Sequence, residues 1–291
     1  MITPNPSDIL GLNPIGPMRF RSSALHGNFG GAIYGGQLLG QAMRAAAATV
    51  PPELLCHSQH AHFIGRGDPA IPVDYDVTPL RDGRSALRRV AASQEGRLVI
   101  EATCSFAHDA EGMTHASAMP SAPPPHACID LTSYVTQRSD RLPPDIVERY
   151  AREYPLERRP VDPDAMFLDG TEPAQMVWLR LRDAASYAAP ADQRCITAYM
   201  SDAWLSAAAF RPHFTIAGSA SFRGMSLDHA VWIHATAPSE GWFLYVTDGP
   251  WAGSRRGFGR GQLFDEGGVL IASAAQEGLS LRTRPTAKDD K

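Results

Sequence analysis

The stretch whose residue types are most suited to chemistry is Tyr199-Met200-Ser201-Asp202, which precedes an apolar run at 203–210. Ser201 or Asp202 is a good N-cap, the run after them is rich in alanine and bulky apolar residues, and Pro212 ends it. The pattern predicts a short helix buried against a sheet. A carboxylate in its first turn would lie among free backbone N–H groups, which favour negative charge. Asp202 is therefore either a chemical group or only a helix cap.

Other polar residues carry weaker signals. The histidine-rich segment 57–62 has no Cys, Asp or Glu at a complementary short spacing, so we expect no metal ion there. Asp228 and His229 are neighbours on a predicted strand and should point to opposite faces, which prevents them from acting as a pair. Ser226 would share a face with Asp228, and we interpret Asp228 and His229 as structural support.

The glycine-rich run 255–261 fits neither a dinucleotide-binding nor a phosphate-loop pattern, and it opens no helix. It predicts a strand that another segment approaches closely. The arginines of this run, and those at the matching place in the first half (Arg84, Arg88 and Arg89), could pair with phosphate groups or could be solvated strand residues. The candidates for substrate binding are Arg88, Arg255 and Arg256. The sequence leaves both interpretations open.

Composition excludes several classes of protein. A hydrophobic content of 44%, a charged content of 20% and a net charge of -4 are typical of a soluble globular protein without a nucleic-acid partner. No run of about 18 apolar residues predicts a membrane span, and the N-terminus resembles no secretion signal. The four cysteines form no CxxC pair, which favours a reducing compartment and a cytoplasmic location. The final AKDDK is predicted to be a disordered tail.

The elements that must position these residues begin with an arm, a helix, four strands and a proline-rich linker, in that order along the chain. A small-residue helix entered through glycines at 30–36 runs to Thr49, after an irregular arm at 1–27. Proline is dense at 117–165, which predicts a surface linker with a short helix at 145–153. Four strands are predicted between the helix and this linker, at 56–64, 73–80, 85–93 and 97–108, with a tight turn at 94–96.

The second half repeats the first. Tyr34-Gly35-Gly36-Gln37 matches 199–202, Phe63 matches Ile233, and 98–100 matches 269–271, with offsets of 165, 170 and 171 residues. Three matches in the same order indicate a duplicated unit. One alanine-rich helix wrapped by a long antiparallel sheet is the hotdog fold, so the prediction is an α+β double hotdog. We place the first repeat at 1–116, the linker at 117–165 and the second repeat at 166–291.

The chain resembles the acyl-CoA thioesterase II (TesB-type) family, whose members are double-hotdog hydrolases that cleave fatty acyl-CoA. The resemblance covers nearly the whole chain, from about residue 30 to 279. Its individual motifs are short, but their order and spacing together are specific. They are Tyr34-Gly35-Gly36-Gln37, Tyr75-Asp76-Val77, Leu80-Arg81-Asp82-Gly83, Arg88-Arg89-Val90-Ala91-Ala92, Met119-Pro120-Ser121-Ala122-Pro123, Ser201-Asp202, Leu227-Asp228-His229 and Gln276-Glu277-Gly278.

The resemblance implies a catalytic trio at Asp202, Ser226 and Gln276. Asp202 would be the general base, and Ser226 and Gln276 would hold the attacking water, with no covalent intermediate. Backbone N–H groups near the helix start would stabilise the oxyanion. Gln37 occupies the place of Asp202 in the first repeat, so we expect one active site per chain and no cofactor beyond the CoA of the substrate.

Two other functions remain open. A non-catalytic acyl-CoA binder or sensor would bind acyl-CoA without releasing thiol. An enoyl-CoA hydratase would need a histidine a few residues from Asp202 on the helix, and none lies between Asp202 and Phe210. No motif indicates the length of the acyl chain of the substrate. Exposed sheet edges in such units favour a homo-oligomer.

Overall fold

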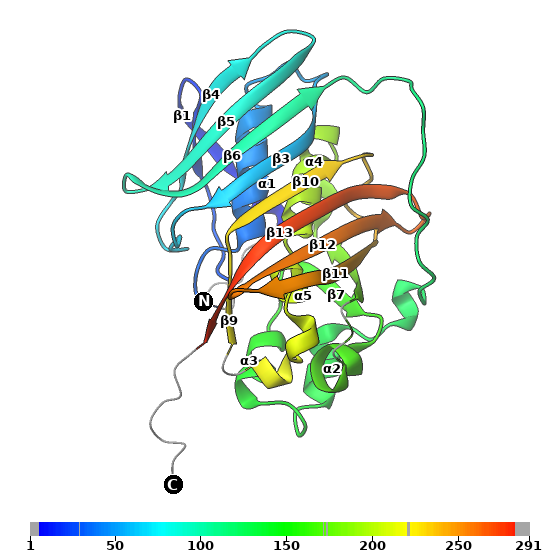
Figure 1. Cartoon of the computed structure of the whole chain (residues 1–291). Helices are drawn as coiled ribbons and strands as arrows, with labels where there is room; N and C mark the ends of the chain where they lie inside the picture. Colours follow the sequence, from blue (N-terminus) through cyan, green and yellow to red (C-terminus); the bar gives the residue numbers. More distant parts are fainter. Residues whose placement is uncertain (1–5, 29, 171, 173, 220–221, 283–291) are drawn as a thin grey trace.

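One long antiparallel sheet organises the chain, and the helices α1 (Gly35–Ala47) and α4 (Pro190–Ser201) lie side by side against one face of it (Figure 1). The computed structural model describes residues 6–28, 30–170, 172, 174–219 and 222–282. Along the sheet the strands follow the order β1-β2-β4-β5-β6-β3-β10-β13-β12-β11-β8-β7, and β9 pairs with β13 beside this path. The predicted tail AKDDK lies outside the described residues.

The first repeat is a helix followed by four strands, close to the ranges expected from the sequence. Ten of the 13 residues of α1 are buried, because its small side chains let the sheet curve around it. Glu95 and Gly96 both have positive φ, as a two-residue hairpin turn requires. The elements are α1 (Gly35–Ala47), β3 (Leu55–Phe63), β4 (Asp74–Arg81), β5 (Ser85–Gln94) and β6 (Arg97–Ala107).

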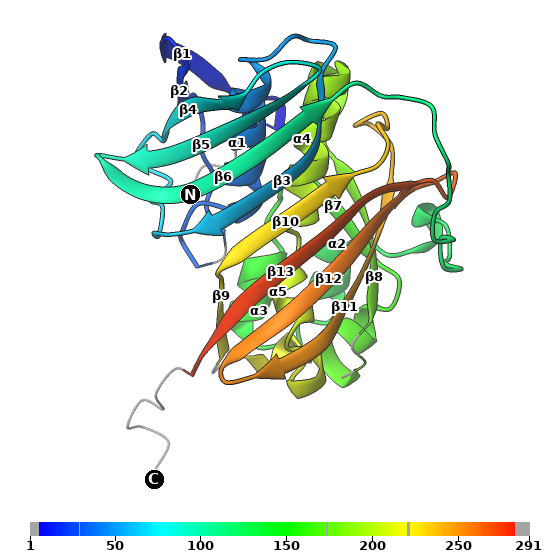
Figure 2. The ribbon, with the colours of Figure 1, turned by 45° about the horizontal axis from the view of Figure 1, so that its top comes forward.

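The second repeat has the same spatial order. Its strands lie as β10-β13-β12-β11, which mirrors β3-β6-β5-β4 of the first repeat. The two halves meet where β3 and β10 pair antiparallel, with Ala230 opposite His60 (Figure 2). The predicted α+β double hotdog is therefore confirmed. The strands of this half are β8 (Gln175–Leu181), β9 (Phe222–Ser226), β10 (Asp228–Ile233), β11 (Phe243–Gly253), β12 (Arg256–Asp265) and β13 (Leu270–Arg282).

The predicted helix start at Ser201 or Asp202 is wrong. A twelve-residue helix, α4 (Pro190–Ser201), ends there, and Asp202 is its C-cap. Pro190 at the first helical position favours this helix, because proline has no N–H to leave unpaired. The expected helix at 203–210 is reduced to α5 (Leu205–Ala208), which follows a turn where Trp204 has a φ of 56°.

Glycines set how closely the helices approach their neighbours. A Cβ on Gly36 would lie 2.3 Å from the Tyr199 carbonyl oxygen, and one on Gly40 would lie 3.0 Å from that of Cys195, so α1 and α4 pack backbone to backbone. A Cβ on Gly259 of β12 would lie 2.4 Å from the Leu205 carbonyl oxygen. The close approach predicted for the glycine-rich run is confirmed, and the approaching segment is α5.

The N-terminal arm is not irregular throughout. It contains a short 3-10 turn (Pro6–Asp8) and a hairpin of β1 (Leu12–Gly16) and β2 (Arg19–Ser22), whose second strand pairs with β4. Arg21 pairs with Asp74 across that junction at 2.6 Å. The sequence signal is weak because these strands are short and mostly exposed.

The proline-rich segment 117–165 carries structure that joins the second half. It contains α2 (Leu131–Gln137), α3 (Pro144–Tyr150) and β7 (Leu156–Pro160), and β7 pairs with β8. α3 matches the short helix expected at 145–153. The division at 116 and 165 stays a prediction. Short helical turns complete the described chain at Pro125–Ala127, Ala165–Asp169, Ala184–Tyr187, Arg211–His213 and Ala217–Ser219. Among the described residues, no helix combines the length and apolar character that a bilayer crossing requires.

Candidate active site

The Asp202 carboxylate lies where the two repeats meet. Its Oδ2 accepts a hydrogen bond from the backbone N–H of Gly36 at 2.8 Å, and its Oδ1 accepts one from Gln276 Nε2 at 3.1 Å. The free N–H that favours the charge therefore belongs to the start of α1, in the other repeat, and not to the helix that follows Asp202. A Cβ on Gly35 would lie 2.9 Å from Oδ2, so the Gly35-Gly36 pair is what admits the carboxylate.

Burial dominates the electrostatics of this carboxylate. The Asp202 side chain is 9% exposed, and desolvation raises its pKa from 3.8 to about 7. The hydrogen bonds from Gln276 and Gly36 act in the opposite direction and favour the charged form. A carboxyl group with a pKa near neutrality can take up and release a proton at physiological pH, as general-base chemistry requires.

Two of the three predicted trio residues are in direct contact. Gln276, on β13, is buried and hydrogen-bonded to Asp202. Ser226 ends β9 and is half-buried; it lies opposite Gly278, which puts it on the same sheet face as Gln276 and diagonal to it. Its hydroxyl makes no hydrogen bond with the described residues. The structure thus places Ser226 beside the Asp202–Gln276 pair without joining it to them.

His229 points at the site, contrary to the expectation for this strand. Ser226 pairs with Gly278 and Ala230 with Ala275, so an advance of four residues on one strand matches an advance of three on β13. The one extra residue is a bulge, which reverses the face of the sheet to which the following side chains point. Ser226 therefore shares its face with His229 and not with Asp228. His229 Nδ1 lies 4.0 Å from Asp202 Oδ1.

Ser201 and Asp228 complete the surroundings. Ser201 Oγ lies 2.9 Å from His229 Nε2, while Asp228 accepts a backbone hydrogen bond from Glu277 at 2.7 Å. The interpretation of Asp228 as structural support fits this contact. Sequence reasoning missed Gly36, Ser201 and the orientation of His229. The one sequence signal for this site was the Gly-Gly pair at the start of a helix. The bulge that orients His229 leaves no signal in the residue types.

Gln37, at the place of Asp202 in the first repeat, has a different environment. It is fully buried, accepts a hydrogen bond from the His26 backbone N–H at 2.8 Å, and donates to the carbonyl oxygens of Ile9 and Ala24 at 2.9 and 3.1 Å. Its amide therefore anchors the N-terminal arm inside the fold.

The three candidate phosphate-binding arginines are not brought together. Arg88 is 2% exposed and donates to Thr49, to Asp82 and to backbone carbonyls, so the protein itself uses its guanidinium group. Arg255 and Arg256 are exposed at the turn between β11 and β12, where Arg256 pairs with Glu277 at 3.3 Å.

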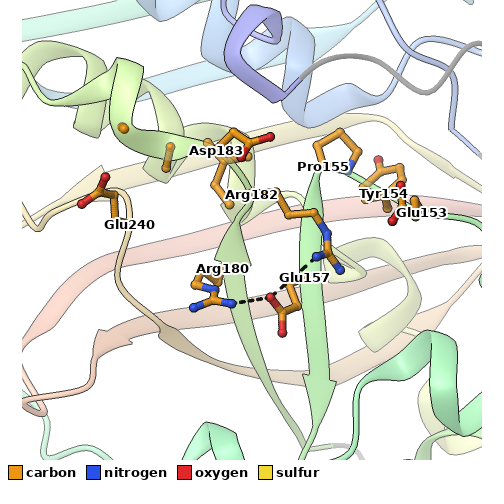
Figure 3. A pocket seen from close by; sticks show the side chains of 11 residues that line it. Glu153, Tyr154, Pro155, Glu157, Arg180, Arg182, Asp183 and Glu240 are labelled. Carbon is orange, nitrogen blue, oxygen red and sulfur yellow. Dashed lines mark hydrogen bonds and ion pairs between the residues drawn. The ribbon is translucent and has the colours of Figure 1, made fainter.

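Two cavities flank the site without including Asp202. The first, of about 630 Å³, is lined by charged residues of β7, β8 and neighbouring loops (Figure 3). Glu157 pairs with Arg180 at 2.6 Å and with Arg182 at 3.9 Å, which neutralises much of that lining. Tyr154, on the same lining, packs edge-on against Tyr34 at the start of α1.

The second cavity, of about 290 Å³, lies over β3, β10, β12 and β13, and its lining includes His229 and Gln276 as well as His60, His62 and Asp228. The His60 ring packs edge-on against Trp232. Within the described part of the chain, no three His, Cys, Asp or Glu residues are grouped in a way that could hold a metal ion.

Comparisons with known proteins agree with this architecture. Residues 24–107 match the model described as "Acyl-CoA thioesterase N-terminal domain", and residues 120–280 match "Acyl-CoA thioesterase C-terminal domain". Acyl-coenzyme A thioesterase 8 of Homo sapiens is 36% identical over 273 residues, which span 89% of this chain and 83% of that protein. Acyl-CoA thioesterase 2 of Haemophilus influenzae is 32% identical over 253 residues, 85% of this chain and 87% of that protein.

A solved structure is similar over the same length. The acyl-CoA thioesterase II TesB2 of Mycobacterium marinum superposes with a TM-score of 0.76 and 31% sequence identity, covering 97% of this chain and 98% of the other. The similarity therefore includes both repeats and the segment between them.

Proposed function

The chain belongs to the acyl-CoA thioesterase family, and we propose that it hydrolyses fatty acyl-CoA to a free fatty acid and CoA at the Asp202 carboxylate. The observation that carries this proposal is a buried carboxylate with a raised pKa, held by a backbone amide of one repeat and a side-chain amide of the other. No covalent enzyme intermediate is required.

Asp202 acts as the general base in the proposed reaction. Its carboxylate takes one proton from a water molecule, and the water oxygen attacks the thioester carbonyl carbon. The carbon–sulfur bond then breaks, and the CoA sulfur takes the proton from Asp202. The product acid releases its remaining proton to solvent. Gln276 holds the base in place, and the Ser226 hydroxyl, on the same face of the sheet, helps to hold the water.

Stabilisation of the oxyanion is assigned to the start of α1. The Gly36 N–H is bound to Asp202, whereas the N–H of Gly35 makes no hydrogen bond with the described residues. Gly35 is the first residue of a 13-residue helix, where the backbone dipoles favour negative charge. The thioester carbonyl oxygen would accept from this group.

Arg255 and Arg256 remain the proposed partners of the CoA phosphates. Both are exposed and lie on the β11–β12 turn of the repeat that supplies Asp202. Arg88 is left out of this proposal, since its guanidinium group is buried and bonded within the protein.

The deciding experiment is a thiol-release assay across acyl-CoAs of graded chain length. Asp202→Asn should lower kcat by about a hundredfold to ten-thousandfold, the range of general-base catalysis, while the variant stays folded. Asp248→Asn is the matched control, because that carboxylate is half-buried and paired with Arg260 on the outside of the sheet. Retention of most activity by Asp202→Asn would remove Asp202 from this role.

The same preparation separates the alternatives. Binding of acyl-CoA without release of thiol would favour a sensor. Hydration of an enoyl-CoA would favour a hydratase, for which His229 near Asp202 supplies the histidine that the helix lacks. A hydroxylamine-trapped acyl ester on Ser226 would exclude direct attack by water.

Homo-oligomerisation is also proposed. The sheet ends at β1, a strand whose residues are half-buried or exposed and whose outer edge is unpaired in the described chain. A second copy that covers this edge would protect it. Sedimentation of the purified chain should give a mass at least twice that of the monomer.

A further inference from the structure

Two buried polar atoms beside Asp202 have no hydrogen-bond partner among the described residues: His229 Nδ1 and Gln276 Oε1. The His229 side chain is 0% exposed, so solvent outside the fold does not reach Nδ1. An unpartnered buried polar atom destabilises the folded state, because it has lost its hydrogen bonds to water without replacing them. The position of two such atoms next to a candidate catalytic base points to a functional use.

The contacts of Ser201 favour one of the two neutral tautomers of His229. Ser201 Oγ lies 2.9 Å from the Ala198 carbonyl oxygen and 2.9 Å from His229 Nε2. A carbonyl oxygen can only accept, so the one hydroxyl hydrogen goes to Ala198. The Nε2–H of His229 then donates to Ser201 Oγ, and Nδ1 keeps a free lone pair. Burial lowers the pKa of His229 to about 4, although the neighbouring Gln276 side chain acts in the opposite direction, so the ring is neutral at pH 7.

Two acceptors consequently face each other near the proposed reaction. His229 Nδ1 and Asp202 Oδ1 are 4.0 Å apart, too far for a direct hydrogen bond. One water that donates to both at about 2.8 Å would have its two bonds at roughly 90°, close to the angle between the two O–H bonds of water. Its oxygen lone pair would then be free for attack.

We propose that His229 is a further catalytic residue, whose Nδ1 accepts the second hydrogen of the attacking water while Asp202 takes the first, and that Ser201 is the residue that positions His229. The proposal rests on the proposed hydrolysis of acyl-CoA. It assigns to His229 the orientation of the water, and it leaves proton abstraction to Asp202.

Two substitutions separate the roles of the ring nitrogens. The amide of asparagine places a polar atom near the position of Nδ1, and that of glutamine places one near Nε2. His229→Gln should therefore lower kcat about a hundredfold with KM changed less than about threefold, because the water loses one of its two acceptors. His229→Asn should keep kcat within about tenfold of wild type. Ser201→Ala should lower kcat about tenfold with little change in KM.

His26 is the matched control. It is also buried, its Nε2 lies 3.0 Å from the Tyr199 hydroxyl, and its Nδ1 is also without a partner among the described residues. Burial lowers its pKa to about 4 as well. Its ring packs against aromatic side chains and not against Asp202. His26→Gln should lower thermal stability as much as His229→Gln does but leave kcat within about threefold.

The outcomes distinguish this proposal from the one on which it rests. Full kcat in His229→Gln overturns the role of His229, while an inactive Asp202→Asn keeps the general base. Equal losses in His229→Gln and His229→Asn, with both variants folded, overturn the assignment to Nδ1. If the variants do not fold, nitrogen NMR of the wild-type chain decides. A neutral Nε2–H tautomer of His229 at pH 7 supports the proposal, and an Nδ1–H tautomer overturns it.

Discussion

Removal of the hydrogen bond from Gln276 should shift the pH dependence of hydrolysis toward higher pH. Burial raises the pKa of Asp202 to about 7. Two hydrogen bonds oppose this effect, and the one from the Gln276 amide lowers the pKa more than the one from Gly36 does. A general base must be unprotonated, so kcat/KM of the wild type should fall about tenfold per pH unit below pH 7 and level off above it. Gln276→Met keeps the volume of the side chain and removes the donor.

The size of the shift follows from the lost interaction. A hydrogen bond to a charged group contributes about 1.5–3 kcal/mol, and one pKa unit corresponds to about 1.4 kcal/mol. The acidic limb of Gln276→Met should therefore move up by about one to two pH units. At pH 7 the variant should lose about 10- to 100-fold in kcat/KM relative to its own plateau.

The assay should follow the ultraviolet absorbance of the thioester, because a thiol reagent would itself titrate in this range. Gln262→Met, on the neighbouring strand β12 and half-buried, is a control for the substitution itself. An acidic limb that stays at the wild-type pH, or moves down, would refute the assignment of Gln276 as a stabiliser of the charged base. A flat wild-type profile would refute Asp202 as the base.

Three further predictions concern stability. The pKa of Asp202 is raised from 3.8 to about 7 in the folded state, so the protonated side chain stabilises the fold. This contribution to the free energy of unfolding, roughly 4 kcal/mol, is fully present below pH 4 and is lost as the pH rises through 7. Asp202→Asn should therefore melt above wild type at pH 8 and near it at pH 4. Gly259→Ala should lower stability by about 1–3 kcal/mol in calorimetry, since its Cβ would lie 2.4 Å from the Leu205 carbonyl oxygen. Gly112→Ala, with no neighbour within 4 Å, should leave stability unchanged. Arg88→Met should lower Tm but leave KM for acyl-CoA within about twofold, because the buried guanidinium group bonds within the protein.

The fold was accessible from the sequence where periodicity and repetition were strong. In the strand predicted at 97–108, polar and apolar residues alternate from Glu101 to Phe106, and the turn before it has the glycine that a positive φ requires. The internal repeat then gave the topology, since each half reproduces the same element order. The hairpin at 12–22 was missed because its strands are short and most of their residues are exposed.

The start of the second helix was misjudged because capping residues are ambiguous. Ser201 and Asp202 are good N-caps in isolation, yet a polar residue also fits the end of a helix. What decides is tertiary: the Tyr245 hydroxyl donates to the Ser201 carbonyl oxygen and satisfies the last turn of α4. Trp204, in the left-handed region, then redirects the chain toward β12.

The candidate site was predictable in part. Asp202 and Gln276 came from motifs, and the structure brings them within 3.1 Å of each other. His229 could not be oriented, because the single extra residue between β9 and β10 reverses which side chain faces inward. Gly36 could not be assigned, because a backbone N–H leaves no mark on the residue type.

Duplication explains why the chain has two repeats but one candidate site. The carboxylate of Asp202 comes from the second repeat, and the amide that binds it, at Gly36, comes from the first. At the corresponding place in the first repeat, Gln37 has no charge and holds the carbonyl oxygens of Ile9 and Ala24. A carboxylate there would meet acceptors and be repelled, so the N-terminal arm and a second base are incompatible. The second repeat in isolation would keep Asp202 and Gln276 but lose the N–H of Gly36, and its base would be less stabilised in the charged form. The two halves are therefore one functional unit.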